Sequence, residues 1–513
     1  MIKYFLRYSI AGVIYALTLP IISSNAQDAG TLEKLEAQDL LIQRQNQRIE
    51  RLEEALETLL QNPQAATPYS EPEGEGKTET KPANPQSPAG KDVADGADPF
   101  AGKRAPKKGY DPEKSFFGPL PRFTSPSGYS FGFSGFFQYD GALYGQESGS
   151  NVPDYRDGTR LKNTAIFLTG VFPKDWIWGL YYNLADSGDA PINGLYGTFA
   201  IYRGFAPWWI MLGNQRSGVG LDPSAFSSSR LFMEEAMPLG SFAFAPGGTA
   251  IGVSTLYRAD GKYLRVGLLT DAAKEANSTN DGATSDEPYG IHARAAWSPI
   301  AERTRALHVG ASGYWRTGGS TKFNSDPEVT VDSNKLIDTG SIERVASYYF
   351  TGIEGAWVQG PLSLQGEYGL VNVLRKNNRS GQAAFQDLNF EGYYAQASYF
   401  LTGESRNYYP RFAGFWRVKP KNDFDLSEGS WGAWEVAARY SYLDLDDGAS
   451  NIPGGGIRGG VADNYTLALN WHLNPFVKVL LNYVQSDVKK ISATGAPAGD
   501  ILHIVGSRLQ LEW

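Results

Sequence analysis

Cysteine is absent from the 513 residues, so the chain forms no disulfide bonds and must be stabilised in another way. It also lacks a run of about twenty apolar residues beyond its N-terminal segment, the length that a membrane-spanning helix needs. The sequence therefore argues against a helical membrane protein. The formal net charge of −8 is modest for this length, so any ion selectivity must come from where the charges lie.

Signals of enzymatic chemistry are equally scarce. There are four histidines without metal-ligand spacing, and no Gly-x-Ser-x-Gly motif is present for a nucleophilic serine. The glycines at 454–456 precede no helix and predict a turn, not a phosphate site. We therefore expect no enzyme, no metal and no cofactor, and a hydrolase with Ser and His on separate strands stays as an alternative. The histidines are His292, His308, His472 and His503, of which His503 is expected to face lipid or a neighbouring subunit.

The chain begins with a predicted export signal at residues 1–26. Lys3 and Arg7 precede an apolar stretch at residues 10–22, and the small-residue triplet at 24–26 is typical of a cleavage site. Export is the consequence, and an uncleaved membrane anchor is the alternative.

Residues 27–60 predict a short coiled coil in the periplasm, where it could contact peptidoglycan. Apolar residues recur every seven positions, and glutamines and leucines occupy the companion positions of the heptad. A single amphipathic helix is the alternative, and so few heptads do not fix the number of helices in the coil. The first set is Leu35, Ile42, Ile49 and Leu56, and the second is Gln38, Gln45, Leu52 and Leu59.

Residues 61–115 are rich in Pro, Gly, Glu, Lys, Ala and Ser, so they predict a disordered linker. From residue 129 onward, segments of alternating apolar and polar residues are separated by short turns and long polar loops. In residues 434–442, even-numbered side chains are predicted to face lipid, whereas Glu435, Arg439 and Ser441 face inward. We therefore predict an all-β membrane protein in which residues 116–513 form an antiparallel β-barrel.

The number of strands follows from the connections. Long connections are predicted after residues 144, 184, 214, 270, 316, 372, 443 and 486. If both ends of the barrel lie in the periplasm, residues 402–430 fall on the periplasmic side and residues 412–418 do not span the membrane. Sixteen strands remain, and residues 214–247 form the third external loop.

The last strand ends on Trp513 after the alternating residues 501–512. An aromatic residue at the end of a final barrel strand resembles the signal that the barrel-assembly machinery recognises. A soluble β-sandwich is the alternative, because its strands also alternate.

Charged residues within the strands are predicted to point inward, because a charge facing lipid costs about 2 to 4 kcal/mol near the middle of the membrane. Cations in a narrow passage lower the energy of a partly dehydrated anion. Alternatively, they pair with inward carboxylates and only hold the wall rigid. Thr164 is expected to share a face with Arg160 and Lys162. The predicted pore-lining cations are Arg160, Lys162, Arg216, Arg265, Arg294, Arg316, Arg439, Lys478 and Arg508, and the predicted acids are Asp140, Glu354, Glu367 and Glu435.

Blocks of sequence resemble the phosphate-selective porin O and P family. They are residues 399–404 (YFLTGE), 432–441 (GAWEVAARYS) and 469–474 (LNWHLN). Residues 160–162 are similar to a basic pair on an early strand of the family, and residues 212–216 to the segment that leads into loop three. The resemblance covers most of the chain from about residue 116.

The resemblance implies a homotrimer of sixteen-stranded barrels, passive diffusion of small anions, and a constriction made by loop three and basic wall residues. The sequence departs from the family pattern after Gln215, where Arg216 and then Ser217-Gly218 stand in place of a basic-aromatic pair, and where Glu235 is acidic. We expect an outer-membrane porin for small anions, with phosphate or polyphosphate as candidates, in contact with lipids and no nucleic acid. The alternatives are a general porin of weak selectivity and a structural barrel tethered to the cell wall.

Overall fold

The computed structural model describes residues 122–146, 153–186, 194–225, 227–242, 248–273, 287–376, 385–448, 455–489 and 499–513. The predicted export signal, coiled coil and linker lie outside these residues. No helix within the described ranges is long and apolar enough to cross a membrane.

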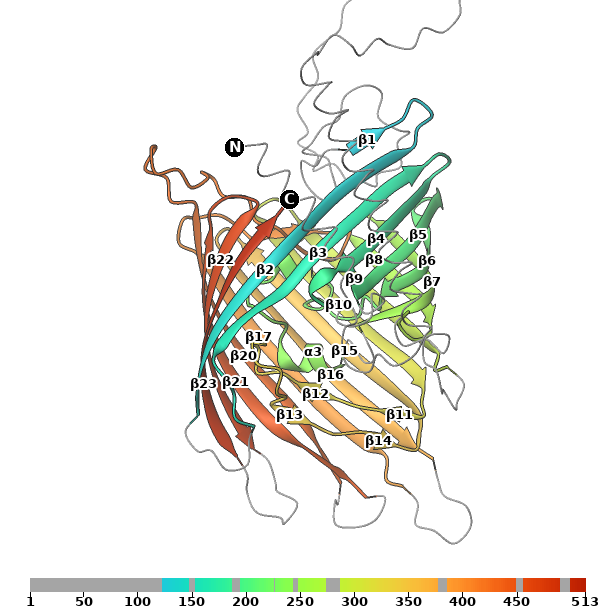
Figure 1. The fold of residues 1–513 in the computed structure, drawn as a ribbon. Helices are drawn as coiled ribbons and strands as arrows, with labels where there is room; N and C mark the ends of the chain where they lie inside the picture. Colours follow the sequence, from blue (N-terminus) through green and yellow to red (C-terminus); the bar gives the residue numbers. More distant parts are fainter. Residues whose placement is uncertain are drawn as a thin grey trace, which may run out of the picture. The chain divides into compact units, whose positions relative to one another are not determined.

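Sixteen strands form the wall of an antiparallel barrel (Figure 1). Each wall strand pairs with the next along the chain, and β23 pairs with β2 to close the circle, which confirms the predicted strand number. The wall strands are β2 (Ser130–Gln146), β3 (Gly158–Phe172), β4 (Trp176–Asn183), β5 (Leu195–Phe205), β6 (Trp208–Arg216), β7 (Thr249–Ala259), β8 (Lys262–Leu269), β9 (Gly290–Ala301), β10 (Arg305–Thr317), β15 (Val345–Gln359), β16 (Leu362–Arg375), β17 (Leu388–Phe400), β20 (Ala433–Asp447), β21 (Ile457–His472), β22 (Val477–Lys489) and β23 (Asp500–Glu512).

The long connections follow the wall strands as predicted, and the strand ends from which they start lie at one end of the barrel, termed here the loop end (Figure 1). The other end, termed the turn end, carries the short turns, the C-terminus and the short strand β1 (Arg122–Thr124), which pairs with β2 (Figure 1). One turn-end connection is longer, and it contains β18 (Asn407–Tyr409) and β19 (Gly414–Trp416). These two strands pair only with each other, which confirms that residues 412–418 do not belong to the wall.

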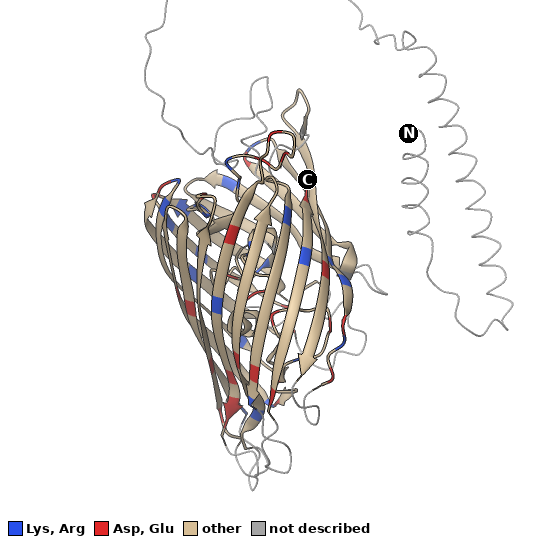
Figure 2. Ribbon diagram, turned by 90° about the vertical axis from the view of Figure 1, so that its left-hand side faces the viewer, with Lys and Arg blue, Asp and Glu red and all other residues tan. Residues whose placement is uncertain are grey.

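Alternation along the wall strands follows the predicted parity. In β20, Glu435, Arg439 and Ser441 are buried inside the barrel, whereas Val436 and Ala438 on the other face are exposed. Figure 2 shows the charged residues scattered along the strands on one side of the wall, with acidic ones gathered toward the loop end. The outer face of such a wall presents apolar side chains to lipid, as a membrane barrel requires.

A β-bulge in β3 breaks this parity at one point. Lys162 and Asn163 both reach the lumen, because an extra residue after Leu161 opposes the partner strand. Thr164 consequently lies on the outer face. The expectation that Thr164 shares a face with Arg160 and Lys162 is therefore wrong.

Three connections fold into the barrel instead of leaving its interior open. Loop three (residues 217–248) contains η4 (Ser227–Ser229) and α3 (Met237–Phe242). Loop five (residues 318–344) contains two small hairpins, β11 (Ser320–Thr321) with β14 (Ile342–Glu343) and β12 (Asn324–Ser325) with β13 (Ile337–Asp338). The third is the turn-end insert (residues 401–432), which carries β18 and β19. Figure 1 shows α3 and the loop-five strands within the ring of wall strands.

Loops three and five are held inside by a large apolar cluster. Phe242 of loop three and Phe323 of loop five contact one another, and both pack on aromatic side chains of the wall. The wall residues of this cluster come mainly from β10, β15–β17 and β20–β23. Because the cluster covers that side of the lumen, the inner faces of β3–β9 are the side left for a passage.

Candidate functional site

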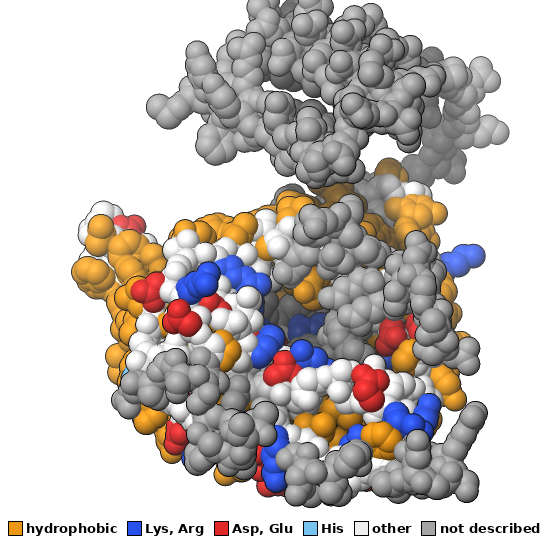
Figure 3. All heavy atoms as spheres, turned by 60° about the horizontal axis from the view of Figure 1, so that its bottom comes forward, with side chains coloured by type: hydrophobic (Ala, Val, Ile, Leu, Met, Phe, Trp, Pro, Cys, Tyr) orange, Lys and Arg blue, Asp and Glu red, His pale blue; other side chains and the backbone are white. Residues whose placement is uncertain are grey.

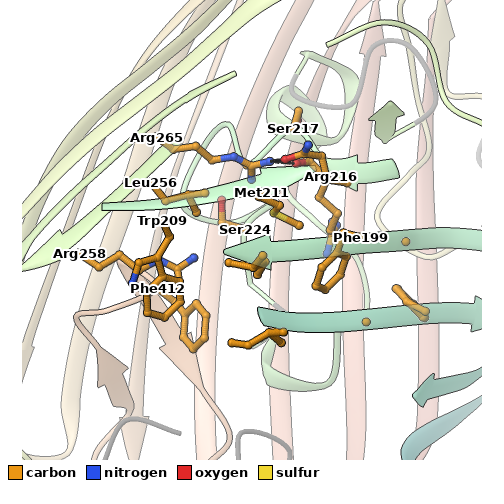
Figure 4. Close-up of a pocket in the computed structure, with 18 of the residues that line it drawn as sticks. Phe199, Trp209, Met211, Arg216, Ser217, Ser224, Leu256, Arg258, Arg265 and Phe412 are labelled. Atoms are coloured by element: carbon orange, nitrogen blue, oxygen red, sulfur yellow. Dashed lines mark hydrogen bonds between the residues drawn. The ribbon is translucent and has the colours of Figure 1, made fainter. Parts of the chain in front are cut away.

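A cavity of about 220 Å³ lies between the inner faces of β3–β9, loop three and the turn-end insert (Figure 4). Seen from the loop end, the barrel is hollowed, and Lys and Arg side chains lie at the edge of the hollow (Figure 3). Within the lumen the cavity lies against β3–β9, which the apolar cluster of loops three and five does not cover.

Much of the cavity wall is apolar. Inward positions on four neighbouring strands carry large apolar side chains, and the turn-end insert adds Phe412 and Phe415. A porin interior is ordinarily polar, so this lining departs from the simple alternation of lipid-facing and lumen-facing residues. The wall residues are Ile177 on β4, Phe199 and Ile201 on β5, Trp209 and Met211 on β6, and Leu256 on β7.

Arg258 brings positive charge to this apolar lining. Its guanidinium carbon lies 4.9 Å from the ring centre of Trp209, 5.0 Å from that of Phe412 and 5.7 Å from that of Tyr263. The Nε atom is buried, and it has no hydrogen-bond partner among the described residues. Sequence reasoning missed Arg258, although Leu256 and Arg258 occupy successive inward positions of β7.

Arg265 is the second cation of the cavity. It donates hydrogen bonds to Gln215 Oε1 at 2.7 Å and to the backbone carbonyl of Arg216 at 2.6 Å. Neither Arg258 nor Arg265 forms an ion pair with a carboxylate within the described part of the chain. Arg216 lines the cavity as well, and its guanidinium lies 3.9 Å from Glu235 of loop three.

Arg406, in the turn-end insert, lies near the cavity and was also missed. It donates to Gln365 Oε1 at 3.1 Å, and its guanidinium carbon stands 3.6 Å from the ring centre of Phe415. Burial lowers the pKa of Arg406, and the nearby carboxylate of Glu435 partly offsets this effect. The alternation signal could not have found Arg406, because the residue lies outside the wall strands.

Besides Arg216, which lies beside Glu235, five of the predicted cations are paired with carboxylates instead of facing an open passage. These contacts are the rigid-wall arrangement that the sequence left open as the alternative. They are Arg294 with Glu354 at 2.7 Å, Arg316 with Asp271 at 2.6 Å, Arg439 with Glu328 at 2.6 Å, Arg508 with Asp140 at 2.7 Å, and Lys162 with Glu234 at 3.0 Å.

Arg160 and Lys478 also point inward, but they bind backbone. Arg160 donates to the carbonyl of Thr330 in loop five at 2.6 Å, and Lys478 Nζ donates to the carbonyl of Arg230 in loop three at 2.7 Å. Both residues therefore anchor the inner loops. Their positive charge still contributes to the potential of the lumen.

The predicted acids all lie inside the barrel. Glu354 binds His308 at 2.9 Å as well as Arg294, and Glu435 lies 3.3 Å from His472. Glu367 accepts the backbone N–H groups of Leu221 and Asp222, each at 2.7 Å. Asp140 pairs with Arg508. These carboxylates hold loop three and buried cations in place, and His503 lies on the outer face beside Tyr483.

Glu234 of loop three lies among several cations, an arrangement that the sequence did not reveal. Burial alone would raise its pKa, but Lys162, Arg508 and Arg230 surround the carboxylate and together lower its pKa to about 2. Burial lowers the pKa of Arg230 to about 10, and the neighbouring Arg216 acts in the same direction. Loop three is therefore attached to the wall through ionised groups.

The chain matches a family model over residues 135–513, and that family is described as phosphate-selective porin O and P. Porin O of Pseudomonas aeruginosa is 30% identical over 365 residues, which cover 66% of this chain and 78% of that protein. An uncharacterized protein of Caulobacter vibrioides is 27% identical over 477 residues, covering 91% of this chain and 87% of the relative.

Solved outer-membrane barrels are similar at low identity. OmpT of Vibrio cholerae aligns with a TM-score of 0.47 and 11% identity, over 76% of this chain and 99% of that one. OprB of Pseudomonas putida aligns with a TM-score of 0.44 and 11% identity, over 75% and 94% of the two chains.

Proposed function

Because the chain belongs to the phosphate-selective porin O and P family, and is therefore an outer-membrane porin and not an enzyme, we propose that small anions diffuse passively through its barrel. Arg258 and Arg265 carry the proposal, since they face the cavity without a carboxylate partner among the described residues. A fixed positive charge in a narrow, poorly screened passage lowers the energy of an anion that has shed part of its water.

The paired cations add less to selectivity. Arg294 and Glu354 together carry no net charge, and the same holds for Arg316 with Asp271. A pair of opposite charges produces a field that falls off faster with distance than that of a single charge. The ion preference of the passage is therefore set by the few cations that have no partner carboxylate.

Phosphate is one permeant anion in this proposal, and it need not be the preferred one. A guanidinium can bind two phosphate oxygens at once, which suits Arg258 and Arg265. Glu235, however, lies beside Arg216 and also contacts Arg230 in loop three. This carboxylate reduces the positive potential at the place where the family pattern has a basic residue.

We propose in addition that the porin works as a homotrimer. The strands β4 and β8 contain 8 residues each, whereas β2 contains 17. At about 3.3 Å per residue and a tilt of roughly 45°, an eight-residue strand covers roughly 19 Å, less than the apolar band of about 25 Å. A neighbouring subunit against this low part of the wall would shield it from lipid.

The N-terminal and C-terminal segments complete the proposal. Residues 1–26 direct export, and residues 27–60 form a periplasmic coiled coil that contacts peptidoglycan, joined to the barrel by the linker at 61–115. Trp513 serves as the signal for the barrel-assembly machinery. Circular dichroism of a peptide that spans residues 27–60 checks its helix content, and a helix signal that rises with peptide concentration would distinguish a coiled coil from a single amphipathic helix.

Planar-bilayer recordings of the purified oligomer test the anion preference. In a KCl gradient the reversal potential should show chloride bias, and added phosphate should reduce the chloride current. Arg258→Gln and Arg265→Gln should each lower the bias, whereas Arg305→Gln, which removes a half-exposed charge at the turn end, should leave it unchanged. Cation bias or no bias would leave a general porin, and no channels at all would leave a structural barrel.

A further inference from the structure

The cavity presents two unlike surfaces to one small volume. On one side lie Ile201, Trp209 and Leu256, which belong to a single apolar cluster of adjacent strands. The guanidinium of Arg258 lies beside Trp209 at the border of this apolar lining, and the guanidinium of Arg265 lies at a separate edge of the cavity. Figure 4 shows Trp209, Arg258 and Phe412 close together, with Arg265 near Arg216 and Ser217 at another edge of the same space.

A small inorganic anion can bind the arginines of the cavity but gains nothing from its apolar side chains. All the oxygens of phosphate need hydrogen-bond donors or water, and the apolar side chains of β4–β7 supply neither. An anion that carries an apolar group can instead place its charged end on the arginines and its apolar end on Ile201 and Phe412. The cavity of about 220 Å³ is also larger than the roughly 150 Å³ in which a protein can hold benzene.

Resting on the proposed anion passage, we infer that the cavity binds small organic anions with an aromatic group, such as aryl phosphates. The ring packs on the apolar wall beside Phe412, and the anionic group binds the guanidinium of Arg258, with Arg265 adding positive charge from another edge of the cavity. Arg258 suits this role, because aromatic faces and not carboxylates surround its guanidinium.

The test compares how phenyl phosphate and methyl phosphate block the chloride current, because the two carry the same charged group. Phenyl phosphate should reach half block at a concentration at least about tenfold lower, since its ring removes more apolar surface from water. Phe412→Ala and Ile201→Asn should bring the two half-blocking concentrations together, because each removes apolar surface from the cavity lining. Both changes face the lumen and leave the lipid-facing wall intact.

Phe424→Ala is the matched control, since Phe424 lies in the same turn-end insert but packs on Trp431 and Trp471. It should keep the tenfold difference. Equal block by phenyl and methyl phosphate in a channel with chloride bias would overturn the inference and leave the proposed function standing, because the apolar lining would then serve only to pack the insert. Absence of chloride bias would contradict the proposed function itself.

Discussion

The carboxylate of Glu328 lies 2.6 Å from the guanidinium of Arg439, with both side chains shielded from solvent. Glu328 belongs to loop five and Arg439 to β20, so the contact joins a loop to the barrel wall across the lumen. The same carboxylate accepts hydrogen bonds from Thr466 on β21 and from the backbone N–H of Met237 in loop three. One acidic residue thus connects both inner loops to the wall.

Glu328→Ala should loosen loop five. The change leaves Arg439 buried without its partner, and breaking a buried pair in this way costs about 3–5 kcal/mol. Single-channel recordings should then show larger conductance and more frequent current fluctuations. Glu343→Ala, an exposed position of the same loop, should behave like the unmodified protein. Unchanged conductance in Glu328→Ala would mean that the apolar cluster and the contacts of Arg160 and Lys162 with Thr330 hold the loop without Glu328.

The pair of Arg294 and Glu354 predicts a difference between single and double substitutions. Arg294→Gln leaves a buried carboxylate without its main cation, whereas Arg294→Gln combined with Glu354→Gln removes both charges. The single variant should therefore lose its heat-resistant mobility on SDS gels at a lower temperature than the double variant. Equal temperatures for both would show that His308, which also binds Glu354, compensates for the lost arginine.

Acid should release loop three only well below neutral pH. Because the folded protein lowers the pKa of Glu234 from 4.5 to about 2, the ionised carboxylate stabilises the docked loop above about pH 4.5. This contribution is lost as the pH falls through about 2. Channel current should accordingly stay steady from pH 7 to pH 4 and fluctuate more as the pH approaches 2.

Glu234→Gln isolates this effect from other titrating groups. The variant should fluctuate at pH 7 as the unmodified channel does near pH 2, because a neutral amide pairs only weakly with Lys162 and Arg508. Fluctuation of the unmodified channel already at pH 5 would contradict the lowered pKa.

Alternation in the sequence was enough to predict the wall but not its interior. A period of two residues tells which face a side chain occupies, so the inward positions of Arg294, Arg439 and Arg508 followed from it. It does not tell what stands opposite in the lumen. Glu328 reaches Arg439 over a separation of 111 residues, and no local pattern marks that contact.

The apolar cavity wall was missed for a related reason. Trp176, Ile177 and Trp178 are consecutive and apolar, so alternation gives no sign that Ile177 faces the lumen. The bulge at Lys162 misled the parity argument in a second way, because an extra residue reverses the faces of the residues that follow it. Arg258 is different, since the same parity reasoning would have found it.

Trp513 extends the pairing of β23 with β2 that closes the barrel. Its backbone exchanges hydrogen bonds of 2.9 and 3.1 Å with Gly135 on β2. Its ring covers Gly135 so closely that a Cβ atom there would lie 2.5 Å from a ring carbon. The same Cβ atom would also press on the carbonyl oxygen of Ala165 on β3. Gly135→Val should therefore displace the ring, disturb the pairing of β2 with β3 and slow folding into liposomes of purified lipid.

Comparison with Trp513→Ala separates the structural role of Trp513 from its proposed role as an assembly signal. If the machinery reads the aromatic side chain, Trp513→Ala should fold in liposomes nearly as well as the unmodified chain, yet accumulate poorly in the outer membrane of cells. Trp513→Phe should restore accumulation, because it keeps an aromatic ring at the terminus. Similar defects of Trp513→Ala in liposomes and in cells would instead assign the residue to barrel closure alone, since no machinery is present in the liposomes.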